Sequence, residues 1–329
     1  MPLARVRSAY VRLRRRALYR RTLRPPLVIL RYHAVGDPEA VGRYVHPGLA
    51  LSAARFRDHV RLLARRFRII VPDEIPEVIA SSARERRPAV LITFDDGYID
   101  NYEVATPILA EEKARGAFYI ATRPLNPGAW LWTSELWRVL PHLPAKEVLL
   151  PPDRRVAIPA DKKERQKVGR QLTVWLSAMP EDQREKVLID LWARTALPRG
   201  DGLAGTFVTP RHLREMRAAG MAIGAHTRSH PQLDLLAPAY RGPELSGSRA
   251  DLEEILGEPV THLAYPNPGG HGTIEPPVRD AAERMGFRTA VTSVTGRIDD
   301  ATDLLRLPRL GIYGGDQERQ LFKALERLN

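Results

Sequence analysis

The chain has 329 residues, of which 43% are hydrophobic and 27% charged, and its formal net charge is +12 at pH 7. This composition is typical of a globular protein with one large domain or two ordinary ones, and it excludes a largely disordered chain. Cysteine is absent, which excludes disulfides, thiolate metal sites and a cysteine nucleophile, so a metal ion would be held by His, Asp or Glu.

Most of the positive charge lies in an N-terminal arm. Residues 1–24 contain nine arginines and no acidic residue, which leaves only +3 for the other 305 residues. Leu3, Val6, Tyr10 and Leu13 recur at steps of three and four, the spacing of one helix face. Such a basic amphipathic helix is suited to an anionic membrane surface, and a solvated or disordered leader is the alternative. Contact with nucleic acid is disfavoured, because no nucleic-acid motif accompanies the arginines.

The location of the protein is also predicted from what the sequence does not contain. No apolar stretch approaches the roughly eighteen residues that a membrane-spanning helix needs. The apolar core of a signal peptide does not follow the first arginines either. We therefore expect a cytoplasmic protein, with peripheral contact at the membrane surface through residues 1–24.

After the arm, short apolar strands alternate with amphipathic helices. The first part of the chain predicts strands over 27–30, 89–94 and 116–120 and helices over 52–67 and 102–113. The last part predicts helices over 210–219, 240–256 and 275–285 and strands over 221–225, 261–265, 287–292 and 307–312. This alternation indicates an α/β fold with a parallel sheet or barrel.

The segment over 124–205 interrupts this alternation. It begins with a tryptophan-rich stretch and continues through a proline-rich patch to two polar helices. We interpret it as a mostly helical insertion that packs beside the barrel or over its mouth. Trp130, Trp132 and Trp137 could stack on sugar rings or form a hydrophobic core, and the sequence leaves both roles open.

Polar side chains follow three of the predicted strands, at the point where each strand ends. These clusters are Asp95 with Asp96, His226 with His230, and Tyr265-Pro266-Asn267. Because the carboxyl ends of parallel strands converge on the active site in α/β folds, we expect clusters that are distant in sequence to meet in space.

The residue types in these clusters suit a hydrolytic metal centre. His226 and His230 are four residues apart, so both imidazoles can reach one ion from a single turn. A carboxylate would complete a set of two histidines and one carboxylate. Of Asp95 and Asp96, one can bind the metal and the other can take a proton from water. Thr227 stands where the zincin motif requires Glu, so the histidine pair is not that motif.

The three clusters resemble motifs of the polysaccharide deacetylases, the NodB homology domain of carbohydrate esterase family 4. Residues 93–98 (TFDDGY) resemble the first motif, and residues 224–231 (GAHTRSHP) resemble the second. Residues 264–267 (AYPN) are similar to a Tyr-Pro variant of the third motif. The resemblance covers roughly 27–123 and 206–312 and leaves the arm and the insertion outside.

The resemblance implies a distorted (β/α) barrel of about seven parallel strands and one divalent metal ion, with Zn²⁺ as the expected ion. It implies that Asp95 is the general base and that Asp96, His226 and His230 bind the metal, which would polarise the acetyl carbonyl and activate water. A backbone N–H of the third motif would help to hold the developing oxyanion. The substrate or oxyanion contacts are therefore expected from Tyr265, Pro266 and Asn267.

Two positions depart from the family pattern. The arginine that orients the base aspartate in the third motif is replaced by Ala264, and Arg309, near the end of a late strand, is the candidate substitute. The usual acid, a histidine in a late Leu-x-x-His motif, is also missing. His33 is the preferred replacement, because a Tyr-His after the first strand is similar to the arrangement in poly-N-acetylglucosamine deacetylases. His271, in a glycine-rich loop, is the alternative acid.

The resemblance implies a hydrolase that removes N-acetyl groups from N-acetylhexosamine units of a polysaccharide or a lipid-linked glycan. An O-acetyl esterase or an amino-sugar deformylase would use the same metal and base, so the sequence does not separate these activities. A metal-free pseudoenzyme that binds glycan or serves as a scaffold is the alternative of another class. The expected organisation is a basic arm over 1–26 and a NodB-like deacetylase domain over 27–329, interrupted by the insertion at about 124–205.

Overall fold

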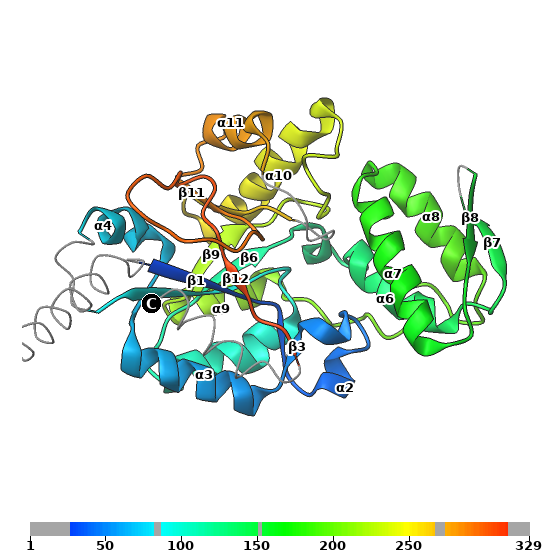
Figure 1. Ribbon diagram of the computed structural model, residues 1–329, viewed down its shortest axis with the longest axis horizontal. Coiled ribbons are helices and arrows are strands. Elements are labelled where there is room, and N and C mark those ends of the chain that lie inside the picture. The colour runs from blue at the N-terminus through cyan, green and yellow to red at the C-terminus, as the bar shows by residue number, and fades with distance from the viewer. Residues whose placement is uncertain (1–26, 82–86, 151–152, 267–273, 315–329) are drawn as a thin grey trace, which may run out of the picture.

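The computed structural model describes residues 27–81, 87–150, 153–266 and 274–314 (Figure 1). The arm over 1–26, with its expected membrane contact, lies outside the described residues, as do Asn267 and His271. Within the described ranges, no helix is both long enough and apolar enough to cross a bilayer.

A curled sheet of parallel strands forms the centre of the molecule. Its seven-strand path runs in the order β11-β10-β9-β6-β5-β1-β12, and β4 pairs with the first half of β5. The strands are β1 (Leu27–Tyr32), β4 (Arg68–Ile70), β5 (Ala89–Phe94), β6 (Ala117–Ile120), β9 (Ala222–Ala225), β10 (His262–Ala264), β11 (Thr289–Val291) and β12 (Leu310–Gly311). Every residue of β1 and β5 is buried, as expected for parallel strands that are covered on both faces. The predicted curled (β/α) barrel is thereby confirmed.

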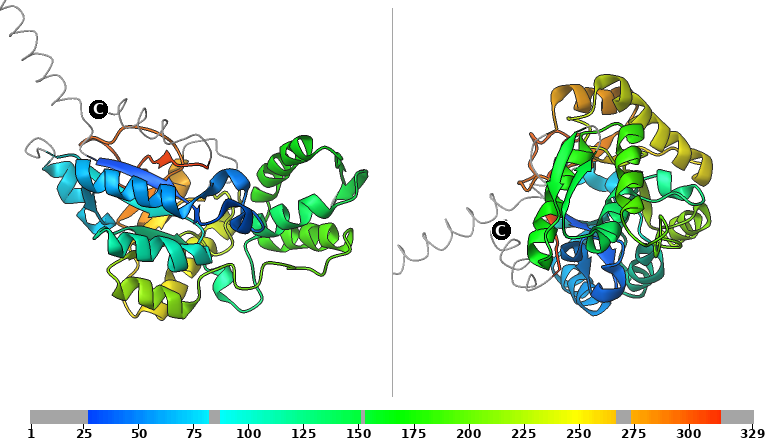
Figure 2. Two further views of the ribbon diagram at one scale, coloured as in Figure 1. Left: turned by 90° about the horizontal axis from the view of Figure 1, so that it is seen from below. Right: turned by 90° about the vertical axis from the view of Figure 1, so that its right-hand side faces the viewer.

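Helices cover the outer face of this sheet (Figures 1 and 2). They are α3 (Ala53–Arg66), α4 (Ile75–Ala80), α5 (Thr106–Glu111), α9 (Pro210–Ala218), α10 (Pro238–Leu256) and α11 (Pro276–Arg284). In α3, Ser52 caps the first turn by accepting a hydrogen bond from the Arg55 N–H. Phe56, Val60 and Leu63 lie on the buried face of the helix, because their spacing of three and four places them on one side.

The helix expected over 102–113 is shorter and less regular than the sequence pattern predicts. A π-helical turn over Asn101–Ala105 precedes α5, which begins at Thr106 and has Pro107 in its first turn. Proline has no amide hydrogen and disrupts the preceding turn, which accounts for the break. The irregular turn begins four positions after Gly97 of the Asp95-Asp96-Gly97 segment, and π-helical turns are frequent next to functional sites.

The segment that interrupts the strand–helix alternation forms a lobe beside the barrel (Figures 1 and 2). It contains α6 (Trp132–Val139), α7 (Lys162–Ser177), α8 (Glu181–Ala193) and an antiparallel hairpin of β7 (Glu147–Leu150) and β8 (Arg154–Ala157). Its apolar side chains form one hydrophobic cluster together with side chains from outside the insertion, among them Val41, Tyr44, Tyr98 and Phe207. Gly169 allows α7 to approach α6 closely, because a Cβ there would lie 2.6 Å from Leu140 Cδ2 and 2.8 Å from the Trp137 ring.

Candidate active site

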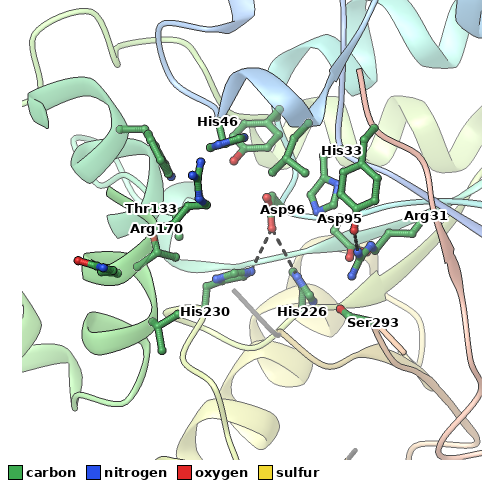
Figure 3. A pocket seen from close by; sticks show the side chains of 17 residues that line it. Arg31, His33, His46, Asp95, Asp96, Thr133, Arg170, His226, His230 and Ser293 are labelled. Carbon is green, nitrogen blue, oxygen red and sulfur yellow. Dashed lines mark hydrogen bonds and ion pairs between the residues drawn. The ribbon is translucent and has the colours of Figure 1, made fainter. Parts of the chain in front are cut away.

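The ends of three strands and the inner side of the insertion enclose one cavity of about 540 Å³ (Figure 3). Asp95 and Asp96 follow β5, His226 follows β9, and His33 follows β1. The residues that we expect to act together therefore line the same cavity, although His33 and His230 are 197 positions apart in the sequence. The remaining lining residues are Arg31, His46, Leu49, Tyr98, Thr133, Trp137, Arg170, Gln171, Thr173, Val174, Ser293 and Tyr313.

Asp96, His226 and His230 form a cluster that can hold a metal ion. One potential ligand atom from each residue lies within 4.8 Å of the others, and all three residues are buried. Asp96 Oδ1 is 3.4 Å from His226 Nε2 and 3.2 Å from His230 Nε2, and it has no hydrogen-bond partner among the described residues. A buried carboxylate oxygen without a donor, facing two imidazole nitrogens, fits a cation such as Zn²⁺.

The surroundings of the cluster orient its ligands. His226 Nδ1 lies 2.7 Å from the Ala264 carbonyl oxygen, which can only accept, so Nδ1 carries the proton and Nε2 presents its lone pair to the cluster. Burial acts to raise the pKa of the Asp96 carboxyl, but the adjacent His230 and His226 hold that pKa well below its usual value. Asp96 is therefore ionised at neutral pH.

Three residues around the cluster have left-handed backbone conformations. Asp96, Thr227 and His230 have φ values of 79°, 63° and 59°. Such conformations cost about 1–3 kcal/mol each in non-glycine residues, and a β-branched residue such as Thr227 is rarely found there. Two of these residues, Thr227 and His230, belong to the loop over 226–230, here called the ligand loop, which therefore has a strained backbone.

Arg309 forms a bidentate ion pair with Asp95. Its Nη1 and Nη2 donate to Asp95 Oδ1 and Oδ2 at 2.7 and 2.8 Å, and both residues are buried. The guanidinium is fixed in turn by hydrogen bonds from Nε to the Thr292 carbonyl and from Nη1 to Thr93 Oγ1. Burial acts to raise the pKa of Asp95, but Arg309 and His226 lower it to about 2. Arg309 lies where the base-orienting role requires it, and that role itself stays a prediction.

His33 lines the cavity, and its Nδ1 is buried without a hydrogen-bond partner among the described residues. Burial lowers the pKa of its imidazole to about 4, so the ring is neutral at pH 7. Arg31 also lines the cavity, although it is not among the site residues expected from the sequence. Its Nη2 donates to the Tyr313 hydroxyl at 2.8 Å. The sequence does indicate a site role for Arg31, because it is the one charged residue in the strand LVILRY and lies two positions before His33, on the same side of the chain.

The third motif is placed differently from what we expected. Tyr265 uses its backbone N–H to bond the Val291 carbonyl at 3.0 Å, and its hydroxyl is buried without a partner, outside the cavity lining. Pro266 has no N–H to donate. Neither residue offers a free amide hydrogen to an oxyanion, while a contact of Tyr265 or Pro266 with the substrate stays a prediction. The same holds for Asn267, which lies outside the described residues.

The insertion contacts the ligand loop directly. Trp132 Nε1 donates to the His230 carbonyl at 2.9 Å. Arg184 of α8 donates to the Ser229 carbonyl and hydroxyl at 3.0 and 2.7 Å and lies over the Trp132 ring. These contacts give the tryptophans separate roles: Trp132 anchors the loop, Trp137 lines the cavity, and Trp130 packs against the core of the insertion.

Fold and site together define the protein as a curled parallel α/β barrel with a candidate metal-binding cluster at its strand ends. A family model described as polysaccharide deacetylase matches residues 175–290. The matched stretch includes His226 and His230 and begins after Asp95 and Asp96. The resemblance of this chain to the polysaccharide deacetylase family is thereby confirmed, and its fold is similar to that of solved deacetylases.

Individual relatives are similar at low sequence identity. The deacetylase PplD of Streptococcus pyogenes, solved in complex with acetate, is 19% identical and superposes with a TM-score of 0.60 over 91% of this chain and 97% of its own. IcaB from Ammonifex degensii is 18% identical, with a TM-score of 0.56 over 92% of this chain and 97% of its own. YxkH of Bacillus subtilis (strain 168), whose name places it with the polysaccharide deacetylases, is 19% identical over 290 residues, 88% of this chain and 72% of its own length.

Proposed function

We propose that this protein is a metal-dependent hydrolase that removes N-acetyl groups from N-acetylhexosamine units of a polysaccharide or lipid-linked glycan. One observation carries the proposal: the Asp96, His226 and His230 cluster lies in the same cavity as an Asp95 carboxylate that Arg309 orients. The family match and the structural similarity to deacetylases support the same activity. An intact ligand cluster is the evidence against a metal-free scaffold.

The residues of the cavity have separate tasks in this proposal. Asp96, His226 and His230 would hold the ion, which when bound supplies a Lewis acid for the acetyl carbonyl and lowers the pKa of water. Asp95 is ionised and fixed by Arg309, so it takes a proton from the attacking water. His33 is neutral in the free protein, so it must gain a proton before it can protonate the departing amine.

The test measures metal content together with acetate release from N-acetylglucosamine oligomers. We expect about one zinc per chain in the wild type, and a loss of activity of about 10²- to 10⁴-fold in Asp95→Asn with the metal retained. Asp58→Asn, which removes an exposed carboxylate from α3, is the matched control and should behave as the wild type. His33→Ala with metal retained and a large rate loss would support the acid role.

The same experiment separates the alternatives. Acetate from O-acetylated xylan but none from N-acetylglucosamine oligomers would establish the esterase, and formate from an N-formyl amino sugar would establish the deformylase. Absence of both metal and product on every substrate would overturn the proposed hydrolase.

A further inference from the structure

The cavity has a second wall that takes no part in the proposed chemistry. It is built mainly by the insertion: the helix α7 presents Arg170, Gln171, Thr173 and Val174 to the cavity, and α6 adds Trp137. Arg170 and Val174 are four residues apart, so they lie on the same helix face. Figure 3 shows Arg170 and His46 near one another on this side, across from Arg31 and Asp95.

The two arginines and two carboxylates that line the cavity differ in how they are paired. Both carboxylates that line the cavity already interact with other side chains. Asp95 pairs with Arg309, and Asp96 faces the two histidines of the candidate metal cluster. Arg31 and Arg170 also line the cavity, and neither forms an ion pair with a carboxylate within the described part of the chain. An arginine in a cleft that has no carboxylate partner can attract a ligand of negative charge.

A second donor lies beside Arg170. His46 Nδ1 accepts a hydrogen bond from the Gly48 N–H at 3.0 Å, which places the proton of the neutral ring on Nε2. Nε2 is buried and has no partner among the described residues. Trp137 packs edge-on against His46, with 4.5 Å between the ring centroids. Two hydrogen-bond donors and one aromatic ring therefore meet on one wall, without an acceptor side chain of opposite charge.

We propose that Arg170 and His46 bind an anionic group of the substrate, a carboxylate or a phosphate on the sugar next to the N-acetylhexosamine. A guanidinium binds either oxyanion through paired N–H donors, and the Nε2–H of His46 adds a third donor. Trp137 supplies an apolar surface for the face of that sugar. This inference rests on the proposed function for its N-acetylhexosamine, whereas the anion preference is a property of the insertion wall.

The experiment compares three probes on the zinc-loaded protein: neutral chitotetraose, a hyaluronan tetrasaccharide that carries uronate carboxylates, and diacetylchitobiose 1-phosphate. We expect KM for one of the anionic probes to be about tenfold lower than for chitotetraose, the effect of one charge-assisted pair. Arg170→Gln should raise KM for that probe about tenfold more than for chitotetraose. Arg170→Lys should retain part of the preference, because the charge remains while the paired donors are lost.

Lys167→Gln is the matched control, because Lys167 lies on the same helix, outside the cavity, and pairs with Glu164. It should change none of the three KM values. The uronate and phosphate arms tell which anion is recognised. Equal KM values for all probes, or an equal effect of Arg170→Gln on neutral and anionic probes, would overturn the inference.

Binding to Asp95→Asn, measured by calorimetry, separates this inference from the proposed function. If no probe releases acetate but the anionic one binds more tightly in an Arg170-dependent way, the anion site stands and the deacetylase proposal fails. If no probe binds, or if binding does not depend on Arg170, the anion site fails whatever the enzyme hydrolyses.

Discussion

The barrel and the insertion differ in how they contribute to the same cavity. The barrel supplies the groups to which we assign the chemistry, each at a strand end and each within or next to a short motif: Asp95, Asp96, His226 and His230. The insertion supplies none of these. It contributes the contacts from Trp132 and Arg184 that hold the ligand loop, and the wall that carries Arg170.

This difference teaches that the candidate reacting groups and the groups that hold their loop lie on different parts of the chain. The two regions share one hydrophobic cluster, to which Tyr44, Tyr98 and Phe207 contribute from outside the insertion. Backbone hydrogen bonds also join them, such as the one from the Gln232 N–H to the Ser177 carbonyl at 2.9 Å. Mutations in each region should therefore affect different measurable properties.

The largest expected effect comes from the barrel. Arg309→Met should lower the free energy of unfolding by about 3–5 kcal/mol, because it leaves the buried Asp95 carboxylate without its cation. Urea unfolding at pH 7 measures this loss. Arg306→Met, at a neighbouring arginine that forms no ion pair among the described residues, is the control and should cost less than about 1 kcal/mol. Similar losses in both variants would show that the ion pair is not what stabilises this edge.

A smaller effect is expected where the barrel meets the insertion. Asp100 accepts hydrogen bonds from the Val35 N–H and the Tyr44 hydroxyl, and Tyr44 belongs to the hydrophobic cluster of the insertion. Burial raises the pKa of the Asp100 carboxyl from 3.8 to about 6. The native state therefore keeps a proton that the unfolded state releases between about pH 4 and 6, and the stability of the wild type falls as pH rises through this window.

Asp100→Asn removes this titration. The stability of the variant relative to the wild type should rise by about 3 kcal/mol between pH 4 and pH 7, the equivalent of about two pKa units. Urea unfolding of both proteins across this range measures the difference. A relative stability that stays constant with pH would mean that Asp100 titrates normally.

A still smaller effect is expected from the insertion, at the contact between Arg184 and Ser229. Arg184→Met should weaken zinc binding by about 10- to 100-fold, because the Ser229 carbonyl and hydroxyl lose the donor that orients the ligand loop. Titration of the metal-free protein with Co²⁺, followed by its visible absorption, reports affinity without relying on activity. Lys186→Met, on the exposed side of the same helix, is the control. Unchanged metal affinity in Arg184→Met would show that the insertion contributes packing and does not orient the ligand loop.

The smallest effect is expected on the outer surface of the insertion. Glu164 and Lys167 form an exposed ion pair on α7 with an N–O distance of 2.6 Å. Solvent screens such pairs, so Glu164→Gln should change the free energy of unfolding by less than about 0.5 kcal/mol and leave metal affinity unchanged. Thermal unfolding at low and high salt measures this, and a loss above 1 kcal/mol would show that this surface is coupled to the core.

By itself, the sequence determined the strand–helix alternation, the parallel barrel and the residues that gather at its strand ends. Local signals sufficed for these features, because continuous apolar runs such as the one before Asp95 define buried strands and a parallel sheet brings strand ends together. The sequence also predicted the pairing of His226 with His230, since these residues are only four positions apart.

Only the tertiary structure decided which distant side chains meet. Arg309 reaches Asp95 from 214 residues away, Arg184 and Trp132 bind the ligand loop from the insertion, and the Tyr265 amide is consumed by the sheet. No local pattern encodes such contacts, because they depend on how strands align and how the insertion docks. Contacts from Trp132 and Arg184, both outside the motif, also help to hold the loop in which Thr227 and His230 have strained φ values.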